Sequence, residues 1–445
     1  MFTCKLFYSG EESTCQASKM ADLEAEVEQF IADDSDFHSK NKDKPLCNML
    51  TRKNFAMYLQ FVFFGIGSVL PIFVIFAAVD YFDDIFPHKQ PEFALNAIYN
   101  PLLFCGSFVN LLWGRAASFK WRIVCGFTVM AVCMIGFIVL DQLELCGSTC
   151  LKSHFWAVLF VAGVLGLADA VCQSTLFGLT THALPPLYTQ GLMLGVGLCG
   201  LLITILRVLT KTTTNNLHVS SYYYFGTAAA FILLVIAAYL HLARGDAFQR
   251  YYSRVPRSGI DTDWKHPIQR FAFFTGEALR VLRYKNVFCH CFLLTLVTAQ
   301  QYIVMPSVVT MAIDFLGNGW FPVLLILVYN IGDVLGRGPL AMYYVYSLHW
   351  AWLSTMMRFV VVVGICLSVP PQMLSDRPAW MATFVAVLGL STGHLTTSLI
   401  SYASSDVPGR AKETVGYLSV LSITLGMAGG SAASYCIKAV LDRTG

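Results

Sequence analysis

Long apolar runs alternate with short polar stretches along the chain from Phe55 onward. Each run has about 20 residues, the length of a helix that crosses a hydrocarbon core of ~30 Å. The runs are continuous and lack a two-residue alternation, so the pattern favours helices over a membrane β-barrel. We predict eleven transmembrane helices: Phe55–Val79, Phe93–Trp113, Trp121–Leu140, Phe155–Leu184, Leu187–Leu209, Tyr222–Leu242, Val287–Ile313, Phe321–Tyr346, Trp350–Val369, Trp380–Tyr402 and Val415–Val440.

The longest internal polar stretch, Arg244–Lys285, divides these spans into six and five. The chain then has four parts: a cytosolic, disordered tail (1–54), a six-helix bundle (55–243), a cytosolic basic loop (244–285) and a five-helix bundle (286–445). The acidic composition of the tail is typical of disordered segments. Two bundles joined by a long loop are typical of secondary transporters, whose solute binds between the halves near the membrane midplane.

Composition supports a membrane protein and argues against several other classes. Hydrophobic residues make up 56% of the chain and charged residues 13%, about half the charged share of a soluble domain. A net charge of +3 is too small to suggest a nucleic-acid partner. We find no nucleophile–base pattern and no metal-ligand spacing, so we predict no enzyme and no cofactor. Cys146 and Cys150 share a polar loop and would form a disulfide only on an oxidising side of the membrane.

The positive charges predict an orientation. The stretch Arg244–Lys285 contains nine Lys and Arg residues, and the loops that would face the other side contain few. Because basic loops stay in the cytosol, we expect a cytosolic N-terminus and an extracytosolic C-terminus. We expect the plasma membrane as the location, with the vacuole or another endomembrane as the alternative.

Some ionisable side chains lie inside the predicted spans, where each costs at least ~2.5 kcal/mol at a helix centre. Asp333 and Arg337 stand four residues apart, on one helical face. They form either a structural ion pair or a clamp for the solute. The neighbouring glycines allow close approach, and Pro339 frees a backbone carbonyl, which favours the clamp. The other embedded ionisable residues are Asp169, Arg207, His290, Arg358 and His394.

Asp169 and Gln173 likewise share one face of the fourth span. The amide of Gln173 has two donors and an acceptor, which suit a nucleobase edge or ribose hydroxyls. A carboxylate in a low-dielectric cavity can bind and release a proton, which makes Asp169 a coupling candidate. The alternatives are a helix–helix hydrogen bond for Gln173 and an ion pair with Arg207 or Arg358 for Asp169.

The remaining embedded residues have simpler interpretations. Arg358 lies near the end of its span and would extend its charged group to the membrane surface. His290 and His394 are more typical of core histidines than of proton relays.

Several motifs resemble the equilibrative nucleoside transporter family, and its plant-type members most closely. The resemblance runs from about Asn54 to the end of the chain. It is carried by Gly166–Gln173 (GLADAVCQ), Leu184–Tyr188 (LPPLY), Trp320–Arg337 (WFPVLLILVYNIGDVLGR), Leu388–Leu395 (LGLSTGHL) and Glu413–Gly416 (ETVG).

This resemblance implies an eleven-helix fold akin to the major facilitator fold with one helix missing. It implies a nucleoside solute, with nucleobases as an alternative, and a transport cycle that is often proton-coupled in plant-type members. Gln173, Asp333 and Arg337 match family positions that line the central cavity, and Asp169 becomes the candidate for proton coupling.

One stretch departs from the family pattern. Ile72 and Phe73 replace a Trp-Asn pair that the family usually has in the first span. Phe73 retains a ring that can stack on a base, but the amide is lost. Another small polar solute, or a receptor-like protein without transport, therefore remains an alternative.

Overall fold

A computed structural model describes residues 46–78, 82, 85–86, 91–114, 117–145, 151–213, 217–246, 248–249, 267–305, 308–309, 315, 320–343, 347–369, 377–405, 407 and 409–444. Within these residues, eleven helices are long and apolar enough to cross a membrane, which confirms the predicted all-helical class. They are α2 (Arg52–Ala77), α4 (Pro91–Trp113), α5 (Phe119–Leu145), α6 (Leu151–Ala183), α7 (Pro186–Thr213), α8 (Leu217–Arg244), α11 (Lys285–Val304), α12 (Trp320–Leu335) with its continuation, α14 (Leu348–Leu367), α15 (Pro378–Ala403) and α16 (Gly409–Thr444).

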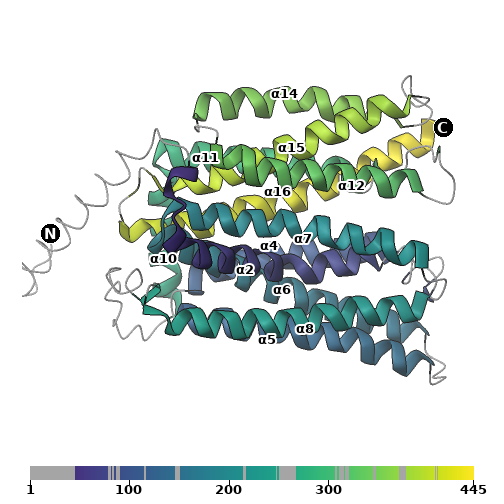
Figure 1. Cartoon of the computed structure of the whole chain (residues 1–445), viewed down its shortest axis with the longest axis horizontal. Helices are drawn as coiled ribbons and strands as arrows, with labels where there is room; N and C mark the ends of the chain where they lie inside the picture. Colours follow the sequence, from purple (N-terminus) through teal and green to yellow (C-terminus); the bar gives the residue numbers. More distant parts are fainter. Residues whose placement is uncertain are drawn as a thin grey trace, which may run out of the picture.

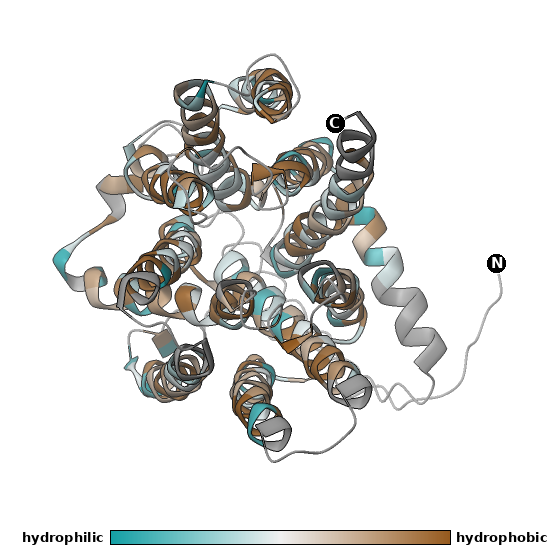
Figure 2. Ribbon diagram, turned by 90° about the vertical axis from the view of Figure 1, so that its right-hand side faces the viewer, coloured by the Kyte–Doolittle hydropathy of each residue, from teal (hydrophilic) through white to brown (hydrophobic). Residues whose placement is uncertain are grey.

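The spans run side by side along one direction (Figure 1), and hydrophobic residues dominate the ribbons seen end-on (Figure 2). We call the end of the bundle where α2 begins the N-side, and the end where α16 finishes the C-side. A short helix, η1 (Leu46–Met49), precedes α2 on the N-side.

Helix pairing follows the same order in both halves of the chain. The first span packs on the fifth (α2 on α7, α11 on α16), and the second packs on the fourth (α4 on α6, α12 on α15). The third also packs on the fourth (α5 on α6, α14 on α15). In the first half α8 covers α5, whereas α14 has no sixth helix beside it within the described residues. This is the arrangement expected for a major facilitator fold with one helix missing.

Glycines set the closest crossing in the first half. An added Cβ on Gly195 of α7 would overlap the carbonyl oxygen of Val62, and one on Gly65 of α2 would overlap that of Leu192. Only small residues allow two helix backbones to approach this closely. The α2–α7 pair is therefore held by direct backbone packing.

The eighth span contains an irregular turn. After α12 comes a π-helical turn, η4 (Gly336–Leu340), and then α13 (Ala341–Tyr343). Pro339 lies inside η4, and the N–H of Ala341 donates to the carbonyl oxygens of both Gly336 and Gly338. Proline lacks an N–H and crowds the preceding turn, and the wider π turn accommodates it.

The structure differs from the sequence expectation in three places. The helix η1 and the first residues of α2 lie within the segment 1–54, which was expected to be disordered. The span predicted to reach Ile313 ends at Val304, because Met305 is extended ahead of Pro306. The stretch expected to be a basic loop contains a helix, α10 (Pro267–Leu282), which packs against α4, α11 and α16.

The two halves meet along two seams. In the α16 seam, α16 packs on α4 and α6, and in the α7 seam, α7 packs on α12 and α15.

A candidate solute site between the two halves

An ion pair lies in the α7 seam. The Nε of Arg337 is 2.7 Å from Oδ2 of Asp333, and the two residues are only 6% and 4% exposed. The other carboxylate oxygen, Oδ1 of Asp333, is buried without a hydrogen-bond partner among the described residues. A buried polar atom without a partner is costly, so this oxygen is available for a hydroxyl donor.

Helix α7 presents a complementary stripe to this pair. An added Cβ on Gly197 would lie 3.0 Å from Oδ2 of Asp333 and 2.7 Å from Cδ of Arg337, so only glycine leaves room there. One turn away, Nη1 of Arg337 is 3.7 Å from the sulfur of Met193. Gln190 donates to the carbonyl oxygen of Arg337 at 2.7 Å. These contacts fix the turn that contains Arg337.

Phe73 approaches the same seam nearer the C-side. An added Cβ on Gly200 would lie 3.3 Å from two ring carbons of Phe73 and 2.7 Å from Oδ1 of Asn330. Asn330 also donates to Oγ1 of Thr204 at 2.8 Å. The aromatic ring and an amide therefore lie beside the same glycine, one turn from Asp333.

Sequence reasoning missed the amide of Asn330 and the α7 stripe. Asn330 and Asp333 of α12 and Arg337 of η4 follow helical spacing in the sequence. A matching stripe on α7 consists of Gln190, Met193, Gly197, Gly200 and Thr204. Helical spacing was the available signal, but the pairing of the two stripes required the fold.

Asp169 is buried in the other half, with 1% of its surface exposed. Its carboxylate accepts a hydrogen bond from the hydroxyl of Tyr99 and another, at 2.9 Å, from Nε2 of Gln173. Among the residues that the structure describes, no cation forms an ion pair with Asp169. The expected alternative partners, Arg207 and Arg358, therefore do not hold this acid. The hydrogen bond of Gln173 runs within α6, so it is not the alternative helix–helix contact.

Tyr302 of α11 connects the two groups of side chains. It interacts electrostatically with Asp169 and also with Asp333 and Arg337. The acids predicted on the fourth and eighth spans therefore both lie within electrostatic range of this residue of α11.

Arg358 does not extend to the membrane surface, contrary to expectation. It is 2% exposed and donates to Oε1 of Gln300 at 3.1 Å, to Oγ of Ser391 at 3.2 Å and to the carbonyl oxygen of Val297 at 3.2 Å. Three neutral acceptors from α11 and α15 satisfy this cation. His290 is buried in α11, with Nδ1 2.6 Å from the carbonyl oxygen of Asn286, and His394 is half-buried in α15.

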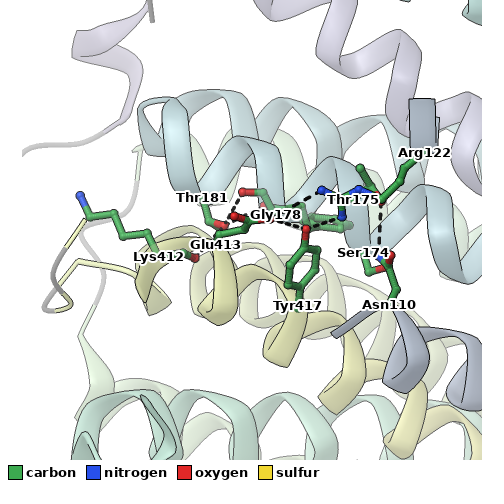
Figure 3. A network of polar contacts seen from close by, with 10 residues as sticks. Asn110, Arg122, Ser174, Thr175, Gly178, Thr181, Lys412, Glu413 and Tyr417 are labelled. Atoms are coloured by element: carbon green, nitrogen blue, oxygen red, sulfur yellow. Dashed lines mark hydrogen bonds and ion pairs between the residues drawn. The ribbon is translucent and has the colours of Figure 1, made fainter. Parts of the chain in front are cut away.

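A polar network joins the halves at the N-side of the α16 seam (Figure 3). Arg122 of α5 donates to the hydroxyl of Tyr417 and lies 3.6 Å from Oε1 of Glu413 on α16. The Tyr417 hydroxyl donates in turn to Glu413. On α6, Thr181 donates to the carbonyl oxygen of Lys412 at 3.1 Å. We call these contacts the N-side joint.

The described residues contain no group of three or more His, Cys, Asp or Glu side chains placed to hold a metal ion. Cys146 and Cys150, the candidate disulfide pair, lie outside the described residues.

Comparison with known proteins gives one family. A family model described as "Nucleoside transporter" matches residues 159–439. Equilibrative nucleotide transporter 1 of Arabidopsis thaliana is 25% identical over 389 residues, covering 85% of each chain. Equilibrative nucleoside transporter 4 of Homo sapiens is 23% identical, covering 86% of this chain and 82% of its own.

Solved structures share the fold. A proton:xylose symporter of the major facilitator superfamily has a TM-score of 0.56 at 10% identity, covering 88% of this chain and 90% of its own. A human organic anion transporter has a TM-score of 0.51 at 15% identity, covering 85% and 92%.

Proposed function

Because the chain belongs to the nucleoside transporter family and is a multi-pass membrane protein, we propose that it carries nucleosides across a membrane by alternating access. The named relatives are transport proteins, in agreement with the prediction that the chain is not an enzyme. The substrate, the coupling and the site residues are our proposals.

The observation that carries the proposal is the free Oδ1 of Asp333 beside the Asp333–Arg337 ion pair in the α7 seam. A ribose hydroxyl donates to Oδ1, while the guanidinium donates to an oxygen of the solute. Phe73 supplies an aromatic face for the base, and the half-buried amide of Gln173 binds the base edge or a hydroxyl. A nucleoside presents both a hydroxyl-rich sugar and a planar base, so it suits this set of groups.

In the proposed cycle, residues 55–243 rock as one body against residues 286–445. The N-side joint holds the halves together at one end in this structure (Figure 3). Access from the N-side requires Arg122 to leave Glu413 and Tyr417. The ion pair at the joint therefore acts as a gate, separate from the groups that bind the solute.

We further propose proton coupling through Asp169. The buried carboxylate has two hydrogen-bond donors and no described cation, so its charged form lacks a counterion. Proton binding from one side and release to the other would then accompany each turn of the cycle. Tyr302 interacts electrostatically both with Asp169 and with the Asp333–Arg337 pair, so we propose that this tyrosine links the proton site to the solute site.

The N-side is proposed to face the cytosol, with the plasma membrane as the location, since the basic residues gather at that end. An epitope tag at the C-terminus should stain on intact cells. Staining only after permeabilisation would reverse the orientation.

The direct test is uptake of labelled adenosine and uridine into proteoliposomes, with and without an inward proton gradient. Gln173→Ala should reduce uptake strongly, whereas Gln142→Ala, which changes an exposed amide near the end of α5, should not. Inhibition by unlabelled nucleobases alone would favour a nucleobase carrier. Binding of nucleosides without uptake would favour a receptor-like relative.

A further inference from the structure

Helix α10 lies outside the eleven spans, on the N-side of the bundle (Figure 1). Its buried face contains Ala278 and Val281, which join an apolar cluster with Leu111 of α4 and Val415 and Leu418 of α16. Glu277 accepts a hydrogen bond from Thr414 at 3.3 Å, next to Glu413 of the N-side joint. One face of α10 therefore packs on helices from both halves, at the proposed gate.

The opposite face of α10 and the turn that leads into α11 combine exposed cations with exposed apolar side chains. Arg280, Arg283 and Lys285 are exposed, and Leu279 and Tyr284 between them are 56% and 45% exposed. We call these five residues the α10 patch. None of its three cations forms an ion pair with a carboxylate in the described part of the chain.

The position of the patch along the membrane normal follows from α11. Lys285 is the first residue of the span Lys285–Val304. Phe288, one turn further on, is 55% exposed on a helix that crosses the apolar core. The patch therefore lies where the hydrocarbon region gives way to headgroups, the level at which basic and aromatic side chains collect.

We propose that the α10 patch binds the headgroups of anionic phospholipids. Arginine forks bind phosphate oxygens in a bidentate manner. The exposed Leu279 and Tyr284 enter the boundary with the acyl chains, as in interfacial amphipathic helices. A soluble acidic partner would satisfy the cations but would leave these apolar groups in water, so a lipid surface is the better occupant.

Lipid bound to the α10 patch holds α10 against α4, α11 and α16. Because α10 contacts both halves beside Glu413, anionic lipid is expected to stabilise the state in which the N-side joint is closed. The proposal concerns the membrane surface and does not depend on the identity of the solute.

The test is native mass spectrometry of the full chain, equilibrated in detergent with equal amounts of phosphatidylserine and phosphatidylcholine. The wild type should retain phosphatidylserine preferentially. R280Q/R283Q/K285Q should bind it about tenfold or more weakly, since each basic residue near an anionic surface contributes to binding. The matched control is R52Q/K120Q/R244Q, which removes three exposed charges from the same end of the bundle but from three separate helices.

Two further arms keep the test decisive. R280K/R283K retains the charge but loses the bidentate fork, so it should bind phosphatidylserine more tightly than the triple variant and more weakly than the wild type. If the triple variant does not fold, R283Q and K285Q are measured singly. Equal retention by wild type and triple variant, or equal loss in the control, would overturn the proposal. Displacement of the lipid by millimolar inorganic phosphate would assign the patch to soluble anions instead.

Discussion

The Asp333–Arg337 pair allows a structural role to be separated from solute binding. Asp333→Asn removes the charge that neutralises Arg337 across 2.7 Å, in a place where both side chains are more than nine-tenths buried. Leaving one member of a buried pair without its counterion costs about 3–5 kcal/mol. That free energy corresponds to a roughly 100-fold or greater loss in the folding equilibrium.

The double variant D333N/R337Q removes the unpaired charge as well. Two neutral amides can then hydrogen-bond to each other, so the remaining cost should be about 1–2 kcal/mol. Thermal unfolding in detergent should therefore rank the wild type first, the double variant second and D333N last.

Uptake of labelled uridine decides between the two roles. If the pair binds solute, the double variant recovers stability but not uptake. Recovery of uptake with an unchanged KM would show that the pair is structural and would refute the clamp. A D333N protein as stable as the wild type would refute the estimate of burial and charge on which the ranking rests.

Three other changes test separate parts of the structure. D169N should preserve folding but abolish any stimulation of uptake by an inward proton gradient. Uptake is measured with and without an uncoupler, and persistent stimulation in D169N would exclude Asp169 as the coupling site. E413Q leaves Arg122 without its carboxylate partner, so amide hydrogen exchange in the first turns of α16 should accelerate about tenfold or more. An unchanged exchange rate would mean that this ion pair does not hold the N-side joint. Gly195→Ala should lower the thermal midpoint sharply, because its Cβ would overlap a carbonyl oxygen of α2. The control Gly226→Ala has open space around its Cβ and should be neutral or stabilising by up to about 1 kcal/mol. Equal effects of the two substitutions would contradict the close crossing of α2 and α7.

The spans were predictable because membrane helices must hide every backbone polar group within about 20 apolar residues. The pairing of Asp333 with Arg337 was predictable for a local reason, since residues four apart share a helical face. Asp169 and Gln173 followed from the same rule. These features need no knowledge of which helices are neighbours.

The remaining features depend on the packing of distant helices. The partners of Arg358 are neutral groups on α11 and α15, so no charge pattern in the sequence marks them. The N-side joint combines residues almost 300 positions apart in the chain, as Arg122 and Tyr417 show. Helix α10 was not predicted, because it is too short and its sequence too rich in charged residues for a membrane span.

The π turn in the eighth span gives the bundle a place to bend. The Ala341 N–H reaches two carbonyl oxygens at once, so its hydrogen bond can pass from Gly336 to Gly338 without first being broken. We expect this turn to rotate at little cost in free energy while α12, which precedes it, keeps its shape. Departure of a solute bound to the Arg337 guanidinium would thus move α13 rather than unwind the whole span.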